Sequence, residues 1–90
     1  MYNIYANKSW STATAMKSIR ISLEMTKKVT DFVMITQDYP DEILVKSGKY
    51  VVDGKSLLGL FSLDLSNPVT VEIYSSDCEK LSNDLKRFEV

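Results

Sequence analysis

The change of hydrophobic period along the chain constrains the fold more than any other feature of the sequence. Apolar and polar side chains alternate over residues 17–23 and again over 69–74, which is typical of strands with one buried face. Residues 26–37 have helical spacing instead. The apolar face of that helix is formed by Val29, Phe32, Val33 and Thr36. Short strands that alternate with helices predict one sheet with its helices on one face.

Turn and capping residues divide the rest of the chain. Ser47-Gly48-Lys49 joins residues 42–46 to residues 50–53 as a β-hairpin. A short helix is predicted from Ser56 to Leu63, with Ser56 as its N-cap. Ser76-Asp77-Cys78-Glu79 has the pattern of a capping box that opens a last helix. The apolar stripe of that helix is formed by Cys78, Leu81, Leu85 and Phe88. The predicted order is therefore β-α-β-β-α-β-α.

The first fifteen residues differ from the rest of the chain. They carry one charge, on Lys8, and no period that lasts a full element. No apolar segment precedes Ala13-Thr14-Ala15, so we do not expect a signal peptide. We expect residues 1–15 to be an N-terminal extension, natural or added, and residues 16–90 to form the domain. The aromatic side chains of this N-terminal arm (residues 1–15) would then lie along the domain surface, or serve a function of their own.

Composition excludes several classes of function. Hydrophobic residues make up 44% and charged residues 26%, as in an ordinary globular protein. The net charge of -1 argues against a nucleic-acid partner, and no apolar run approaches the ~20 residues of a membrane span. The chain has no histidine, which excludes imidazole catalysis, phosphohistidine and histidine-ligated metal sites. Its single cysteine cannot form an internal disulfide or a paired-cysteine metal site. We therefore expect a cytoplasmic domain that is not an enzyme and holds no metal or cofactor.

One stretch of the chain carries a specific resemblance. Residues 54–63 are Gly-Lys-Ser-Leu-Leu-Gly-Leu-Phe-Ser-Leu. They resemble, without a gap, the Lys-Ser-(Ile/Leu)-(Met/Leu)-Gly-(Val/Leu)-Met-Ser-Leu segment of the HPr family, the phosphocarriers of the bacterial phosphoenolpyruvate:sugar phosphotransferase system. The similarity extends back through Tyr39 and forward to Ile73, and weakly over residues 16–23. The resemblance implies an α+β open-faced β-sandwich, in which helices cover one face of a four-stranded antiparallel sheet.

The sequence departs from the family where an active member carries its phosphorylated histidine. Active members have an Ile-His-Ala-Arg-Pro-like run between the first strand and the first helix. Here residues 23–29 are Leu-Glu-Met-Thr-Lys-Lys-Val, so Met25 and Thr26 would form a degenerate active-site loop. Lys27 stands about where the phosphate-binding arginine would be. A thioether is neither nucleophile nor base, and lysine lacks the planar fork that grips a phosphate. The resemblance therefore implies an HPr-like protein that cannot carry a phosphohistidine.

Ser56 is the candidate regulatory residue. In the HPr family the serine at this position receives a phosphate from a dedicated kinase, and the flanking Lys55 and Leu57 are kept here. A phosphate at a helix N-terminus meets free backbone amides and the positive end of the helix dipole. The alternative is a simple N-cap serine, which is worth ~1 kcal/mol.

The short helix carries more large apolar side chains than one buried stripe can use. They are Leu57, Leu58, Leu60, Phe61 and Leu63. A surface helix needs a single apolar stripe, so we expect Leu60 and Leu63 in the core. The other three would form an exposed patch that marks a protein-binding surface. The alternatives are that the N-terminal arm, or a second copy of the chain, covers this patch.

Lys27 and Lys28 open the first helix, and they are candidate contacts for an acidic partner or simply a solvated face. Together these residues predict a binding or regulatory module in sugar transport. An HPr kinase, a transcription regulator and a phosphotransferase-system component are its candidate partners. Two other hypotheses stay open, namely an ancillary phosphocarrier that uses another nucleophile and a structural domain that self-associates through the short helix. The oligomeric state is not determined by the sequence.

Overall fold

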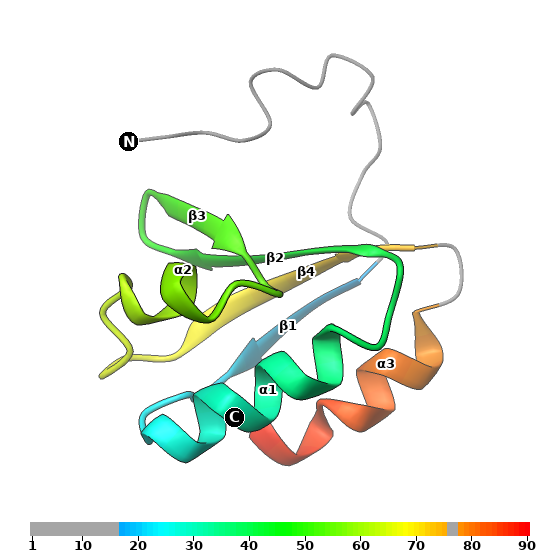
Figure 1. Ribbon diagram of the computed structural model, residues 1–90, viewed down its shortest axis with the longest axis horizontal. Helices are drawn as coiled ribbons and strands as arrows, with labels where there is room; N and C mark the ends of the chain where they lie inside the picture. Colours follow the sequence, from blue (N-terminus) through cyan, green and yellow to red (C-terminus); the bar gives the residue numbers. More distant parts are fainter. Residues whose placement is uncertain (1–16, 76–77) are drawn as a thin grey trace.

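The computed structural model describes residues 17–75 and 78–90, and these residues form a sheet with helices on one face (Figure 1). The elements are β1 (Lys17–Ile21), α1 (Thr26–Thr36), β2 (Glu42–Ser47), β3 (Tyr50–Asp53), α2 (Leu57–Phe61), β4 (Val69–Tyr74), α3 (Glu79–Asp84) and a 3-10 turn, η1 (Lys86–Phe88). The sheet has four antiparallel strands in the order β1-β4-β2-β3. The predicted α+β open-faced sandwich is confirmed.

The central strand β4 sets the register of the sheet. Val71 pairs with Ile19 of β1 on one side and with Val45 of β2 on the other. Because side chains alternate between faces, these three valine and isoleucine side chains all point toward the helices and are buried. The hairpin from β2 to β3 turns at Gly48, whose φ of 59° lies in the left-handed region that glycine adopts without steric cost.

The helices supply the other half of the core. In α1 the four predicted core residues are buried, and Phe32 packs edge-on against Phe88 of η1 with ring centroids 5.9 Å apart. Leu81 and Leu85 of the C-terminal segment are also fully buried. The chain end then returns to β1, where the amide of Ser22 donates to the carbonyl of Phe88 over 2.8 Å. Helix α3 and η1 are thereby held beside α1 (Figure 1).

Two predictions concern residues outside the described part of the chain. Ser76 and Asp77 of the expected capping box lie there, while α3 begins at Glu79 with Cys78 in the N-cap position. Residues 1–15 lie there as well, so the boundary between the N-terminal arm and the domain stays a prediction. Of the helices in residues 17–75 and 78–90, none is long and apolar enough to cross a membrane.

Strand β2 differs from the other strands because three consecutive side chains are buried. Ile43 and Val45 point toward the helices, as the register with β4 requires. Leu44 lies between them and must point to the opposite face, yet it is also buried. The sheet is therefore covered on both faces at this one position.

Candidate functional site

Helix α2 starts at a serine cap. Ser56 has an extended backbone (φ -102°, ψ 111°), and its Oγ accepts a hydrogen bond from the amide of Gly59 over 3.0 Å. This satisfies one of the amides that a first helical turn leaves without a partner. The prediction that Ser56 is the N-cap is confirmed.

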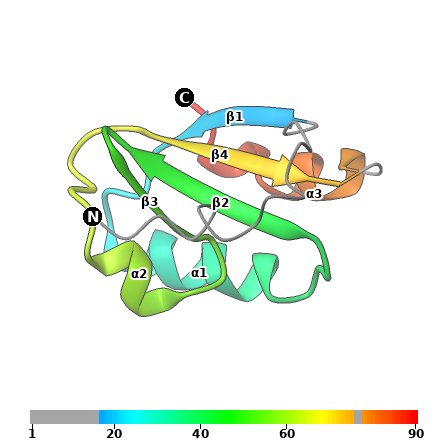
Figure 2. The same ribbon diagram turned by 90° about the horizontal axis from the view of Figure 1, so that it is seen from above.

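The residues before the cap tie α2 to the end of α1. The Oγ1 of buried Thr36 donates to the carbonyl of Gly54 over 2.8 Å. The side-chain amide of Gln37 donates to the carbonyl of Lys55 over 3.2 Å, and the Lys55 amine in turn donates to the carbonyl of Tyr39. Three hydrogen bonds therefore join the end of α1 and the residues that follow it to Gly54 and Lys55, the two residues that precede Ser56. Figure 2 shows the two helices side by side.

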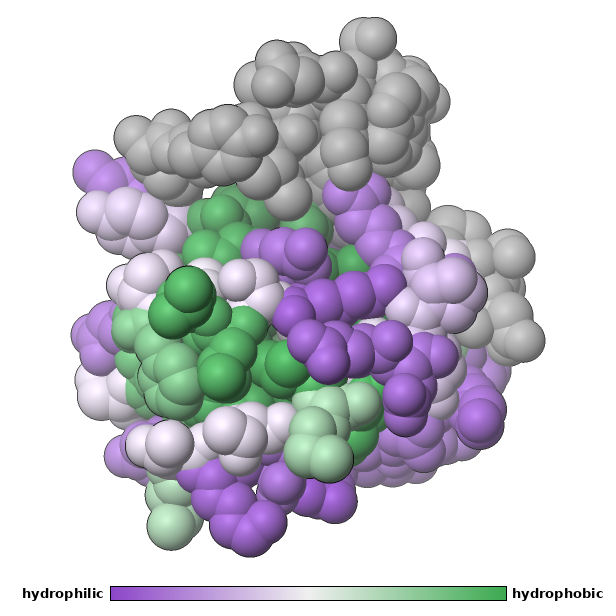
Figure 3. Space-filling model, viewed as in Figure 1, coloured by the Kyte–Doolittle hydropathy of each residue, from purple (hydrophilic) through white to green (hydrophobic). Residues whose placement is uncertain are grey.

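The apolar side chains of α2 divide between the core and the surface. Leu60 is fully buried and Leu63 nearly so, as expected. Leu57, Leu58 and Phe61 are 39%, 84% and 43% exposed, and we call these three residues the α2 patch. Phe61 lies four residues after Leu57 and three after Leu58, so its side chain neighbours both of them on the helix surface. Figure 3 shows apolar surface gathered over α2 and bordered by hydrophilic residues.

Gly59 brings α2 close to the sheet. A Cβ at this position would lie 3.3 Å from the Cβ of Val52 in β3 and 3.2 Å from the Ser56 Oγ. Both separations are tighter than ordinary van der Waals contact, so a larger residue would require the side chains of Val52 and Ser56 to give way by a few tenths of an ångström. Gly59 is thus explained by packing within the chain.

The loop before α1 brings Met25 to the start of that helix. Met25 occupies the N-cap position with an extended backbone, and its carbonyl accepts from the amides of Lys28 and Val29 at 2.9 and 3.2 Å. Its thioether is exposed, and so is Thr26, the first helical residue. In both ribbon views the start of α1 lies on the same side of the molecule as α2 (Figures 1 and 2). That Met25 replaces an active-site histidine stays a prediction.

The two lysines of α1 have different surroundings. Lys27 is exposed, and its amine lies 3.1 Å from the Asp31 carboxylate one turn later. The same carboxylate also accepts from the Arg87 guanidinium over 2.9 Å. Lys28 is half-buried. An exposed i,i+4 pair contributes only about 0.3–0.5 kcal/mol, so Lys27 can exchange this partner for another carboxylate at little cost.

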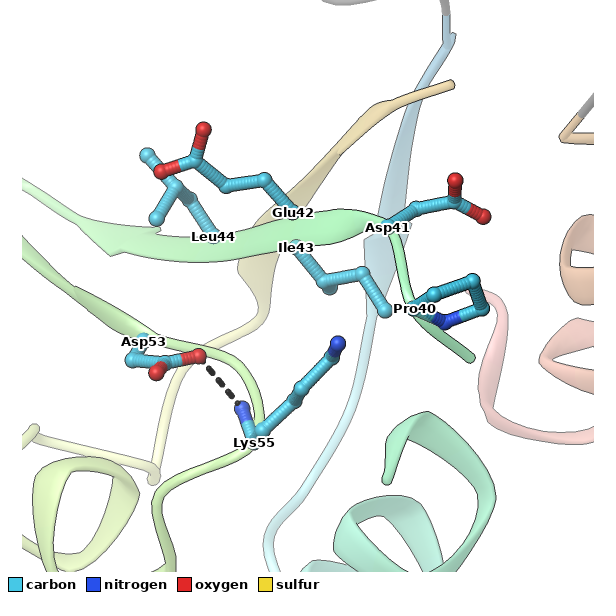
Figure 4. Close-up of a pocket in the computed structure, with 7 residues that line it drawn as sticks. All are labelled: Pro40, Asp41, Glu42, Ile43, Leu44, Asp53 and Lys55. Atoms are coloured by element: carbon cyan, nitrogen blue, oxygen red, sulfur yellow. Dashed lines mark hydrogen bonds between the residues drawn. The ribbon is translucent and has the colours of Figure 1, made fainter. Parts of the chain in front are cut away.

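An open pocket of about 240 Å³ lies between β2 and the segment before α2 (Figure 4). It is lined by Pro40, Asp41, Glu42, Ile43, Leu44, Asp53 and Lys55. The Asp53 carboxylate accepts from the backbone amide of Lys55 over 2.9 Å, and the lysine amine is held by the Tyr39 carbonyl. Both charged groups therefore have structural roles. Within residues 17–75 and 78–90, no three His, Cys, Asp or Glu side chains gather closely enough to hold a metal ion.

Tyr39 links the loop after α1 to the last helix. Its hydroxyl donates to the Asp84 carboxylate over 2.5 Å, and the amine of Lys80 lies 5.8 Å from the centre of its ring. The hydrogen bond to Asp84, helped by partial burial and by the negative charges of Asp84 and Asp38, raises the pKa of Tyr39 to about 12. The phenol therefore stays neutral at physiological pH and acts as a structural tie.

Sequence reasoning missed two features of this region. The Lys55–Tyr39 contact joins residues that are sixteen positions apart, and nothing in the local pattern indicates it. The burial of Leu44 was detectable, because Ile43-Leu44-Val45 is a continuous apolar run and not an alternation. Such a run is typical of a strand that is covered on both faces.

Comparison with known proteins identifies the fold. No family model matches the chain, and no curated protein matches it. Among solved structures, HPr-C-His from Thermoanaerobacter tengcongensis superimposes with a TM-score of 0.68 and 24% identity, over 80% of this chain and 92% of that one. The phosphocarrier protein HPr from Bacillus anthracis str. Ames gives a TM-score of 0.67 and 20% identity, over 86% of this chain and all of that one. Identities this low establish a shared architecture. The chain therefore has the open-faced sandwich fold of the HPr phosphocarriers.

Proposed function

We propose that this protein is a non-catalytic HPr-like module that binds a protein partner through the α2 patch. Phosphorylation of Ser56 regulates that contact. The chain does not carry phosphohistidine because it has no histidine. An HPr kinase, a transcription regulator or another phosphotransferase-system component is the expected partner, with a role in the regulation of sugar transport.

The exposure of the α2 patch is the observation that carries this proposal. Leu58 is 84% exposed on a helix that is otherwise anchored in the core by Leu60. Burial of one such side chain in an interface is worth about 1.5–3 kcal/mol. The helix is also held by the hydrogen bonds from α1, so little backbone freedom is lost when a partner binds.

Lys27 and Lys28 extend the proposed surface toward α1. Lys27 is exposed and exchanges its pairing with Asp31 for a partner carboxylate. The exposed side chains of Met25 and Thr26, just before the lysines, add uncharged contact area to the same region. An acidic rim on the partner would complement this border, and it would favour association at low ionic strength.

Phosphorylation of Ser56 acts on the edge of the α2 patch. Ser56 directly precedes Leu57, and a phosphate adds about -1.5 to -2 charges there at neutral pH. A partner with apolar side chains facing the patch would have to desolvate this charge, whereas a partner with arginine or lysine would gain from it. The modification therefore selects between partners.

The interface is tested with the variant Phe61→Asp and the matched control Met34→Asp. Met34 is 69% exposed on α1, so both variants place one carboxylate at an exposed apolar position. Affinity for each candidate partner is measured by calorimetry. We expect Phe61→Asp to weaken binding at least tenfold, which is about 1.4 kcal/mol, and Met34→Asp to leave it unchanged. Equal affinities for both variants and the original chain would refute the interface.

The switch is tested by incubation of the protein with ATP and the HPr kinase of its host. We expect one phosphate on Ser56, which Ser56→Ala abolishes and Ser62→Ala does not. Ser62 is an exposed serine at the other end of the same helix, so it controls for nonspecific phosphorylation. If phosphate appears on another residue, or on none, the proposed regulation through Ser56 is refuted. The proposed binding through the α2 patch is not affected by that result.

Two further measurements distinguish the remaining hypotheses. Acid-labile phosphate on the chain after incubation with phosphoenolpyruvate and Enzyme I would show an ancillary phosphocarrier with another nucleophile. Self-association would appear as a sedimentation coefficient that rises with protein concentration. If Phe61→Asp abolishes this rise, the α2 patch is the contact. We expect neither result.

A further inference from the structure

The open face of the sheet, opposite the helices, carries a buried leucine, Leu44, that neither the core beneath the helices nor the α2 patch explains. We propose that this face is a docking site for the N-terminal arm, residues 1–15 of the same chain. This inference goes beyond the proposed function and does not depend on it.

The central observation is the burial of Leu44. Leu44 pairs with Glu72 of β4 and Asp53 of β3, and Figure 4 shows its side chain leaving β2 on the side opposite Ile43. Ile43 belongs to the core beneath the helices, and Leu44 does not. Leu44 is nevertheless only 1% exposed. The α1, α2 and α3 helices pack on the other face, so they do not account for the burial of Leu44 (Figure 1).

The neighbours of Leu44 form a polar rim around a small apolar centre. Val51 of β3 lies diagonally across from Leu44 and is half-buried, which extends the apolar centre. The Glu72 side chain is only 16% exposed, and its carboxylate accepts from Lys46 at 3.0 Å and from the Tyr74 hydroxyl at 2.8 Å. When an uncharged segment covers charged groups that are paired in this way, the cost of desolvation is reduced, because each partner replaces part of the water that the group loses.

The N-terminal arm reaches this face easily. It leads into β1, which begins at Lys17 opposite Ile73. Leu44 lies on the second strand from β1, a distance of about 10 Å at ~4.8 Å for each strand. An extended chain of the length of the arm spans about 50 Å, so the arm can cross the whole sheet and return.

The composition of the arm fits the surface. It carries five large side chains that are apolar or aromatic, namely Met1, Tyr2, Ile4, Tyr5 and Trp10, and only one charged side chain, Lys8. Tyrosine and tryptophan have an apolar ring and a polar edge, which suits an apolar centre with a polar rim. A nearly uncharged arm also avoids repulsion by either sign of the mixed charges around Leu44. The arm thus covers the sheet, and the α2 patch stays free for a partner.

Trp10 is the only tryptophan of the chain and reports directly on the arm. We would measure its emission maximum and its quenching by acrylamide in the full chain, in Leu44→Gln and in Leu58→Gln. The two variants make the same change on the open face and on the α2 patch. We expect Trp10 to be protected in the original chain and in Leu58→Gln, and several-fold more accessible in Leu44→Gln. Protection lost only in Leu58→Gln would place the arm on the α2 patch, and would overturn the inference.

Two further measurements keep the test decisive. Nuclear Overhauser contacts between the Leu44 methyl groups and the aromatic protons of Tyr2, Tyr5 or Trp10 are expected in the unmodified chain, and their absence overturns the inference even if Leu44→Gln fails to fold. Trp10 protection that disappears on dilution would show that a second copy or its arm covers the face, which also overturns it. Loss of Phe61-dependent binding would affect the proposed function alone.

Discussion

The hydroxyl of Thr36 is expected to hold the end of α1 to the segment that leads into α2. Thr36 is fully buried, and its Oγ1 lies 2.8 Å from the carbonyl oxygen of Gly54 and 3.1 Å from that of Val33. Thr36→Val keeps the shape of the side chain and nearly the same helix propensity. The substitution removes the hydroxyl donor and leaves the buried Gly54 carbonyl without this hydrogen bond. A buried acceptor that loses its donor costs about 1–3 kcal/mol.

The loss is reduced by the added methyl group, so we expect Thr36→Val to lower the free energy of unfolding by about 1–2 kcal/mol. In a domain of this size that corresponds to a fall in Tm of about 5–15 °C. The matched control is Thr30→Val, because Thr30 donates from the same helix to the carbonyl of Lys27 over 2.9 Å at a partly exposed position. We expect the free energy of unfolding of this control to stay within about 0.5 kcal/mol of that of the original chain.

Urea unfolding followed by circular dichroism measures both variants. Native-state hydrogen exchange adds a local readout, since loss of the tie should speed exchange of the Gly59 amide, which the Ser56 cap holds. Equal stabilities for Thr36→Val and Thr30→Val would refute the reasoning. The bond to Gly54 would then contribute no net stability, and packing alone would fix α2 against α1.

Three further predictions concern the same framework. Gly54→Ala should cost about 1–3 kcal/mol in urea unfolding, because its Cβ would lie 2.7 Å from the Ile43 Cγ2, and a variant of unchanged stability would contradict the tight approach. Ser56→Ala should cost ~1 kcal/mol through loss of the cap, while Ser56→Asp, which can also cap, should recover most of it. The pKa of Tyr39 is raised from 10.0 to about 12, so the folded state favours the neutral phenol. Its contribution is complete below pH 10 and is lost as the pH rises through 12. The Tm, measured from pH 9 to 12, should therefore fall less steeply with pH for Tyr39→Phe than for the original chain. Parallel curves would show that the bond to Asp84 does not contribute to stability.

The elements of this fold were predictable because their signals are local. A period of two over residues 69–74 places every second side chain on one face, whatever the rest of the chain does. The same holds for the helical spacing of α1 and for the buried Leu60 of α2. Ser56 was predictable as a cap because the capping bond spans only three residues.

The capping box before α3 stays a prediction. Ser76 lies outside the described residues, and the structure places Cys78 at the N-cap of α3. Contacts between distant segments were not predictable at all. The hydroxyl of Tyr39 meets Asp84 forty-five positions away, and this contact depends on how α3 packs beside the loop that follows α1.

By itself the sequence determined the order of strands and helices, the Gly48 turn, and the impossibility of a phosphohistidine, because composition and short-range backbone geometry decide each of these. Which groups from distant segments meet depends on the packing of the whole chain. Thr36 finds Gly54 and Lys55 finds Tyr39 because the register of the sheet and the packing of α1 bring those segments together. The burial of Leu44 on the face away from the helices belongs to the same class, since the cover of a sheet face is set by the path of the whole chain and not by the alternation within one strand.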